Sequence, residues 1–385
     1  MGNLLVVATG GAGGDLQPLL AAALALQERG RPVSWVGDAG VARALAKLDI
    51  DAESLDPSLD LGPRLVAAVR EARELGGEDP AAPGRIVQTR LGQWAAEVSV
   101  ALRRVIEQRN PAALATSLFG VEAVAVAEPA CPWSVINSTF YIGPNPPREL
   151  TDDVAARAIA LIKRYRDLLD QPDLVLHGTD RAFDLGFDAL PPHHHYVGPL
   201  GIWEQPSPVP PYLDEPGDPW VLVTISSQVA DDIPLAQAAI EALSTKPVRV
   251  LVTVGPDHDP AELSAVPANC VIEQYASHRA VLERGSLLVS HAGHGSVMKA
   301  LWHGRPMVLV PWGRDQPGVA ERARALGVAE VVPRETASAD RLSAAIDTVL
   351  STQAMSDRAS LHARRLNQTD PAGRAADLLE SLIQG

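Results

Sequence analysis

The stretch from Leu287 to Ala320 constrains the fold of this chain more than any other part of the sequence. It reads LLVSHAGHGSVMKALWHGRPMVLVPWGRDQPGVA. The run Leu287 to Ser290 predicts the end of a buried strand, and the turn after it leads into a helix with Ser296 as its N-cap. Met307 to Val310 predicts a second buried strand. Buried strands joined by a helix are typical of an α/β fold with a parallel sheet.

The turn between the first strand and the helix has the features of a phosphate site. Its glycines expose backbone N–H groups at the positive end of a helix and let a phosphate approach the backbone closely. His291, at the strand edge, can donate to a phosphate oxygen. Asp315 and Gln316 follow the next strand, at the edge of the sheet where open α/β folds bind ligands. A carboxylate beside a carboxamide there suits the hydroxyls of a sugar.

The same stretch resembles the donor-nucleotide motif of the GT-B glycosyltransferases of the UGT and macrolide or glycopeptide antibiotic type. The family pattern is H-x-G-x-G-(S/T), then G-x-P, then P-x-x-x-D-Q. The resemblance implies that the first group of residues holds the donor diphosphate and that the closing pair holds the donor sugar. The matching diphosphate residues are His291, Gly293, Gly295 and Ser296, and the sugar residues are Asp315 and Gln316.

The N-terminus predicts a β-α-β unit that starts with a glycine-rich loop. Leu4 to Thr9 predicts a strand, Leu16 to Arg29 an amphipathic helix, and Val33 to Gly37 the next strand. The dinucleotide fingerprint G-x-G-x-x-G fails in the loop between them. Because Asp38 lies near the place of a ribose-binding acid, a dinucleotide-dependent oxidoreductase is retained as the less favoured alternative.

The resemblance gives the loop a different role. Gly14-Asp15-Leu16-Gln17-Pro18 matches the family's G-D-x-x-P form, which implies that Asp15 is the catalytic base and that Gly14 adjoins the acceptor. The alternative is that Asp15 caps the following helix, and the two roles are compatible. Relatives with a catalytic histidine carry an orienting aspartate near Thr116, which this chain lacks. A carboxylate base fits that absence, because it has no tautomer to fix.

Further positions follow from the resemblance. Ser226 and Ser227 end a predicted strand whose loop lies against the diphosphate in relatives. Tyr275 and Ala276 loosely match the place where relatives hold the nucleoside. We therefore interpret the serines as diphosphate-binding and the second pair as nucleoside-binding.

The loop from Ser138 to Pro147 is a candidate wall of the acceptor site, with Phe140 and Tyr141 as its aromatic residues. The alternative is an ordinary proline-braced connection. The run His193 to His195 lies near a predicted strand. Since three adjacent side chains of a strand cannot all point one way, we expect no metal site there.

Composition limits the possible partners. A net charge of -14 argues against a nucleic-acid groove, but not against one small anionic donor. The only cysteines, Cys131 and Cys270, are far apart and predict reduced thiols in a cytoplasmic protein. No segment reaches the roughly 20 apolar residues of a membrane helix, so stable membrane insertion is not expected. We expect a monomer or a homodimer.

At 385 residues, 46% of them apolar, the chain can build two cores. We predict two Rossmann-like domains of the α/β class facing each other across a cleft, the GT-B arrangement. The N-terminal acceptor-binding domain covers residues 1–203, a proline-rich linker 204–219, and the C-terminal nucleotide-sugar-binding domain 220–370. A last helix, within 371–385, is expected to cross back onto the N-terminal domain.

The predicted function is therefore an inverting glycosyltransferase. It would move a sugar from a UDP or dTDP sugar, its co-substrate, to a small and mostly apolar natural-product acceptor. The resemblance implies no cofactor and no metal, because a helix dipole with an imidazole can serve the diphosphate in place of a divalent ion. The main alternative is a non-catalytic nucleotide-sugar-binding protein of the same fold.

Overall fold

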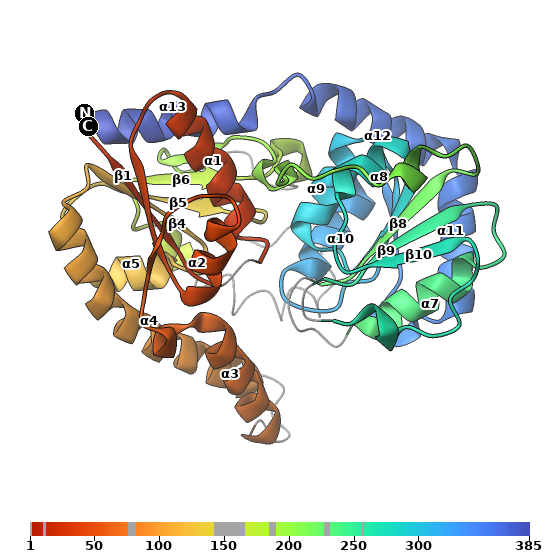
Figure 1. Ribbon diagram of the computed structural model, residues 1–385, viewed down its shortest axis with the longest axis horizontal. Coiled ribbons are helices and arrows are strands. Elements are labelled where there is room, and N and C mark those ends of the chain that lie inside the picture. Colours follow the sequence, from red (N-terminus) through yellow and green to blue (C-terminus); the bar gives the residue numbers. More distant parts are fainter. Residues whose placement is uncertain are drawn as a thin grey trace.

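The computed structural model describes residues 2–10, 13–75, 82–141, 166–184, 190–226, 232–255 and 258–385. Within these residues the chain forms two parallel sheets, each flanked by helices (Figure 1). The described helices include none that is both long and apolar enough to cross a membrane.

The first sheet contains seven strands in the order β3-β2-β1-β4-β5-β6-β7, and all of its pairs are parallel. Its strands are β1 (Leu4–Ala8), β2 (Val33–Gly37), β3 (Glu53–Ser54), β4 (Ala113–Ser117), β5 (Trp133–Asn137), β6 (Leu174–His177) and β7 (His194–Tyr196). The described helices around it are α1 (Leu16–Glu28), α2 (Ala39–Ala46), α3 (Leu61–Leu75), α4 (Ala82–Arg109) and α5 (Val121–Ala127).

The second sheet contains six strands in the order β10-β9-β8-β11-β12-β13, again all parallel. Its strands are β8 (Trp220–Thr224), β9 (Arg249–Thr253), β10 (Cys270–Glu273), β11 (Gly285–Ser290), β12 (Met307–Leu309) and β13 (Ala329–Val331). Its helices are α7 (Ile233–Leu243), α8 (His278–Arg284), α9 (His294–Trp302), α10 (Gln316–Ala325), α11 (Ala339–Ser351) and α12 (Gln353–Leu366).

Both sheets follow the same topology, which confirms the predicted α/β class with two Rossmann-like halves. In each sheet the chain moves outward in one direction, then returns to the centre and moves outward in the other. The central strands are continuous apolar runs such as β8, because helices cover both faces of a parallel sheet. Ligands of such sheets bind beyond the carboxyl ends of the strands where the direction reverses. Those points lie after β1 and β4 in one half, and after β8 and β11 in the other.

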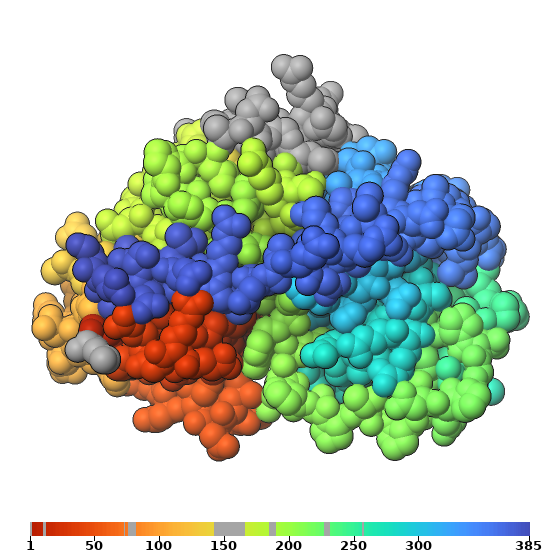
Figure 2. Space-filling view, turned by 90° about the horizontal axis from the view of Figure 1, so that it is seen from above, coloured from red at the N-terminus to blue at the C-terminus, as the bar shows by residue number. Residues whose placement is uncertain are grey.

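The last helix, α13 (Pro371–Gln384), packs against α1 of the first half. Its buried face, which includes Ala375, Ala376 and Leu379, joins the core of the first sheet. Figure 2 shows the C-terminal segment running across one face of both halves, and the two chain ends lie together in Figure 1. The last helix therefore ties the second half of the chain back to the first.

α10 begins at Gln316, with Pro317 in its first turn, where a missing N–H costs nothing.

Candidate active site

Asp15 stands at the N-cap position of α1, yet its side chain does not cap that helix. Its carboxylate instead accepts hydrogen bonds from the backbone N–H of Phe119, at 3.3 Å, and from the hydroxyl of Ser138. The capping interpretation was therefore wrong. Burial raises the pKa of Asp15 to about 6, and the nearby charge of Asp315 acts in the same direction. A half-buried carboxylate with such a pKa can take up a proton near neutral pH.

The segment after β5 places the two acidic residues beside each other. Ser138 binds Asp15, and the next residue, Thr139, donates from Oγ1 to Oδ2 of Asp315 at 2.7 Å. Asn137 fixes this segment, because its Oδ1 accepts from Thr139 N–H at 3.1 Å and its Nδ2 donates to the carbonyl of Phe140 at 3.0 Å. Two carboxylates from two different sheets are thus bound by adjacent hydroxyls. The sequence analysis placed Ser138 and Thr139 in the candidate acceptor-site loop but gave neither a role of its own, because nothing local marks them.

The glycine turn after β11 differs from its prediction in one respect. α9 begins at His294 with Gly293 in the N-cap position, so Ser296 lies inside the helix and is not its cap. His291 is 7% exposed and its Nδ1 lies 3.4 Å from the carbonyl of Thr224, so Nδ1–H donates there. Burial lowers the pKa of His291, which keeps the ring neutral near pH 7.

Gly293 is glycine for a steric reason. A Cβ at this position would stand 2.5 Å from Nε2 of His291, whereas a Cβ at Gly295 would meet nothing closer than 3.9 Å. Ala292, which lies between His291 and Gly293, has a left-handed backbone with φ of 66°. The turn is therefore shaped around the histidine ring, and Gly295 at the start of α9 lies beside the backbone of Gly201.

A polar group lies beside this turn at the carboxyl end of β8. The N–H of Ser226 donates to Oδ2 of the buried Asp232 at 2.7 Å, and its Oγ accepts from Nη2 of Arg314 at 2.8 Å. Both Arg314 and Asp232 are close enough to His291 to influence its pKa. Ser227 lies outside the described residues. The sequence analysis missed Arg314, although a cation immediately before the Asp-Gln pair was a usable signal.

Asp315 and Gln316 stand where β12 leads into α10, as predicted from their position after the strand. Gln316 is only 3% exposed, and its Oε1 accepts from the N–H groups of Trp312 and Gly313, at 2.7 and 2.9 Å. The carboxamide oxygen therefore holds the turn that presents Asp315.

His294 is a second buried histidine of the turn that the sequence analysis did not assign. Its Nε2 lies 3.0 Å from Oγ1 of Thr179, which belongs to the loop after β6 of the other half. Burial lowers its pKa to about 4, so the ring is neutral at physiological pH. Its signal in the sequence was its place in the H-A-G-H-G run. It joins the donor-side turn to the N-terminal half of the chain.

The two aromatic residues predicted to line the acceptor site make contacts within the protein. The ring of Phe140 lies 3.8 Å from the guanidinium carbon of Arg322. Tyr141 is 5% exposed and packs edge-on against His177 and His194. Of the predicted nucleoside pair, Tyr275 is 61% exposed and Ala276 is buried, both in the loop between β10 and α8.

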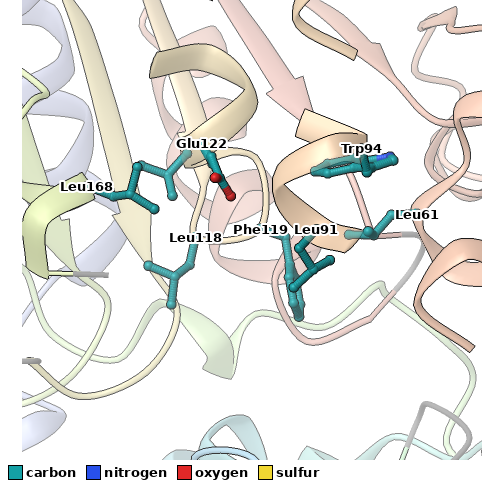
Figure 3. Close-up of a pocket in the computed structure, with 8 residues that line it drawn as sticks. Leu61, Leu91, Trp94, Leu118, Phe119, Glu122 and Leu168 are labelled. Atoms are coloured by element: carbon teal, nitrogen blue, oxygen red, sulfur yellow. The ribbon is translucent and has the colours of Figure 1, made fainter. Parts of the chain in front are cut away.

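An apolar pocket lies next to Asp15, between α3, α4 and the segment after β4 (Figure 3). One of its lining residues is Phe119, whose N–H binds the Asp15 carboxylate. The cavity volume is about 20 Å³, which is room for about one water molecule. Gly14, predicted to adjoin the acceptor, has open space where a Cβ would stand. The lining residues are Leu61, Leu91, Trp94, Leu118, Phe119, Val121, Glu122 and Leu168.

Known proteins resemble this chain in sequence and in fold. Residues 220–370 match the family described as glycosyltransferase family 28 C-terminal domain. The chain is 31% identical over 231 residues to the 4'-demethylrebeccamycin synthase of Lentzea aerocolonigenes, a match that covers 57% of this chain and 52% of that relative. It is 22% identical over 385 residues to the NDP-glycosyltransferase YjiC of Bacillus subtilis strain 168, covering 96% of this chain and 95% of that one.

Solved structures share the fold along the whole chain. The glycotransferase of kitacinnamycin superposes with a TM-score of 0.74 at 23% identity, covering 99% of each chain. The spinosyn rhamnosyltransferase complexed with thymidine diphosphate has a TM-score of 0.72 at 18% identity, covering 99% of each chain. The same enzyme has also been solved with spinosyn aglycone (TM-score 0.70, 17% identity, 98% of this chain and 99% of that one).

The fold of this chain is the GT-B fold of these solved glycosyltransferases. Its sequence is similar to those of antibiotic glycosyltransferases, and residues 220–370 match the glycosyltransferase family 28 C-terminal domain. The resemblance inferred from the donor motif is thereby confirmed.

Proposed function

We propose that this chain is an inverting glycosyltransferase that transfers a sugar from a nucleoside diphosphate sugar to a small natural-product acceptor. The observation that carries the proposal is the placement of Asp15. It is a half-buried carboxylate with a raised pKa, it adjoins a small apolar cavity, and two successive residues connect it to Asp315 at the carboxyl edge of the other sheet.

In this proposal the donor diphosphate binds at the start of α9. The backbone at Gly295 and Ser296 and the helix dipole favour negative charge there. Nε2 of neutral His291 and the cation of Arg314 border the same place. Thymidine diphosphate is the ligand of the related spinosyn rhamnosyltransferase, which supports dTDP or UDP as the carrier. Asp315 then faces the hydroxyls of the donor sugar, and the proposed mechanism uses no metal and no cofactor.

The acceptor binds beside Asp15, where Phe119 and the other apolar residues around this small cavity contribute part of its wall, and it presents its nucleophilic group to Asp15. Asp15 removes the proton of that group while its heteroatom forms a bond to the anomeric carbon. The bond from the anomeric carbon to the diphosphate oxygen breaks in the same step, which inverts the configuration. Negative charge then grows on the leaving diphosphate, where the start of α9 stabilises it. Lining residues such as Leu91, Trp94 and Leu118 favour a mostly apolar acceptor, as the aglycone ligand of the spinosyn enzyme also suggests.

The test is Asp15→Asn with a panel of UDP and dTDP sugars and apolar alcohols or phenols as acceptors. Because asparagine cannot accept a proton at neutral pH, we expect turnover to fall by about 10²–10⁴ while nucleoside diphosphate affinity is retained. Release of nucleoside diphosphate is followed by chromatography, and affinity by calorimetry. A wild-type protein that binds nucleotide sugars but never releases diphosphate would support the non-catalytic alternative. Near-normal turnover by a folded Asp15→Asn enzyme would remove Asp15 as the base.

A further inference from the structure

Three potential metal ligands converge at the end of the first sheet where β6 and β7 begin. One ligand atom from each of Asp170, His193 and His194 lies within 4.8 Å of the other two. The sequence analysis expected adjacent histidines to diverge, as they do along a strand. β7 begins only at His194, so that rule does not separate it from His193, and the two ring centroids are 4.5 Å apart. His195, in contrast, is close to Arg374 of α13, whose charge contributes to lowering its pKa.

The two imidazoles point at one common acceptor. Nε2 of His193 and Nε2 of His194 lie 3.3 and 3.2 Å from the carbonyl oxygen of Leu169. Ligand atoms around a tetrahedral zinc ion, with bonds of about 2.0–2.1 Å, stand roughly 3.4 Å from one another. The cluster therefore needs a contraction of about 1.4 Å at most. Asp170 is exposed and His193 is half-buried, so these two side chains have room to move toward the buried His194.

A chain of buried hydrogen bonds determines which ring nitrogen of His177 and of His194 carries the proton. The amide of Asn137 is oriented by its bonds to Thr139 and Phe140, so its Nδ2 donates to Nδ1 of His177 at 3.0 Å. His177 is neutral because burial holds its pKa well below the usual value. Its remaining proton is thus on Nε2, which donates to Nδ1 of His194 at 3.0 Å. The proton of neutral His194 is then on Nε2, directed at Leu169.

We propose that Asp170, His193 and His194 form a binding site for one divalent transition-metal ion, such as Zn²⁺ or Ni²⁺. Imidazole and carboxylate are ligands that such ions accept, and three protein ligands leave one position for water. The site lies at the amino end of β6 and β7, whereas Asp15 lies beyond the carboxyl end of β1. Binding requires the lone pair of His194 Nε2, so the proton of that ring moves to Nδ1. That proton then faces Nε2 of His177, so the proton of His177 moves from Nε2 to Nδ1 and its hydrogen bond with Asn137 is lost.

The experiment is calorimetric titration of ZnCl₂ into the full chain, prepared without an affinity tag and stripped with a chelator. We expect one ion per chain, at least tenfold weaker binding for His193→Ala, and unchanged binding for the matched control His195→Ala. Asp170→Asn should also weaken binding, and it leaves the buried side chains untouched. Nitrogen NMR of the imidazoles should show His194 changing its protonated nitrogen as zinc is added. Absence of zinc binding by the wild type, or equal binding by His193→Ala and His195→Ala, would overturn the proposal.

Discussion

The hydroxyl of Ser138 donates a hydrogen bond to Oδ1 of Asp15, across 123 residues of sequence. This bond stabilises the ionised carboxylate and therefore opposes the effect of burial on the pKa of Asp15, which is raised to about 6. Only the ionised form can accept a proton from the acceptor. In the proposed mechanism, Ser138 therefore helps to set the pH at which Asp15 can act as the base.

We expect kcat/KM to rise with pH through about 6 and to level off above pH 7, if Asp15 is the base. Ser138→Ala removes a bond to the ionised form, so the rising limb should move to higher pH. Thr139→Val is the matched control, because Thr139 binds Asp315 instead of Asp15. The measurement is the pH profile of kcat/KM for the three proteins. Equal displacement of the limb by both variants would contradict the role given to Ser138.

The same pKa predicts how the stability of the fold depends on pH. Because folding raises the pKa of Asp15 from 3.8 to about 6, the folded state holds this proton more tightly, and the stabilisation is lost as pH rises through 6. Asparagine does not titrate, so Asp15→Asn does not lose this stabilisation as the pH rises. The free energy of unfolding of the variant, relative to wild type, should increase by up to about 3 kcal/mol between pH 4 and pH 7.5. Urea unfolding at both pH values measures it, and a constant difference would show that Asp15 titrates normally.

The two glycines of the donor turn should respond differently to alanine. In Gly293→Ala the new Cβ would stand 2.5 Å from Nε2 of His291, so the ring must move, at a cost of about 1–3 kcal/mol in stability. Gly295→Ala meets nothing closer than 3.9 Å, so its stability should be unchanged. Calorimetry should show weaker nucleoside diphosphate binding for Gly293→Ala because His291 is displaced. Gly295→Ala should weaken binding only by blocking the approach of the phosphate.

These outcomes distinguish the role of Gly295, which is direct contact with the phosphate, from the role of Gly293, which is to leave space for the His291 ring. Loss of affinity in Gly295→Ala without loss of stability would support direct phosphate contact at α9. If Gly293→Ala retained both its melting temperature and its affinity, the assignment of His291 to the diphosphate would be wrong.

A buried ion pair joins the two halves of the chain. Nε of Arg322, on α10, lies 3.1 Å from Oδ1 of Asp184, and both side chains are almost completely buried. Arg322→Met leaves the Asp184 carboxylate without its cation, so it should cost about 3–5 kcal/mol of stability. The double variant with Asp184→Asn should recover most of that loss, since Tyr141 N–H and Tyr196 OH can still donate to the amide oxygen.

Arg324→Met provides the control, because this arginine pairs with Glu321 on the exposed surface of the same helix and should cost at most about 1 kcal/mol. Thermal and urea unfolding measure the stability of the wild type, Arg322→Met, the double variant and Arg324→Met. A double variant no more stable than Arg322→Met would show that the loss comes from packing on Phe140, which Arg322 also contacts.

Local sequence patterns determined the elements and the donor turn. Continuous apolar runs such as Trp220 to Thr224 and Met307 to Leu309 predict buried parallel strands. Helices cover both faces of a parallel sheet, so the side chains on both sides of the strand are buried. The spacing of His291, Gly293 and Gly295 predicts the turn after β11, in which position 293 must be glycine because a Cβ there would collide with the histidine. These properties depend on neighbouring residues alone, and they were readable without a structure.

Only the tertiary structure decided which distant groups meet. Asp15 and Asp315 come together because Ser138 and Thr139, 123 residues after one and 176 before the other, bind one each. It also turned the Asp15 side chain away from its own helix, although the sequence made a cap equally reasonable. His193 and His194 converge for a similar reason, because the point where β7 begins depends on its pairing with β6. Burial and long-range pairing arise only when both sheets are assembled, so no local pattern could specify these contacts.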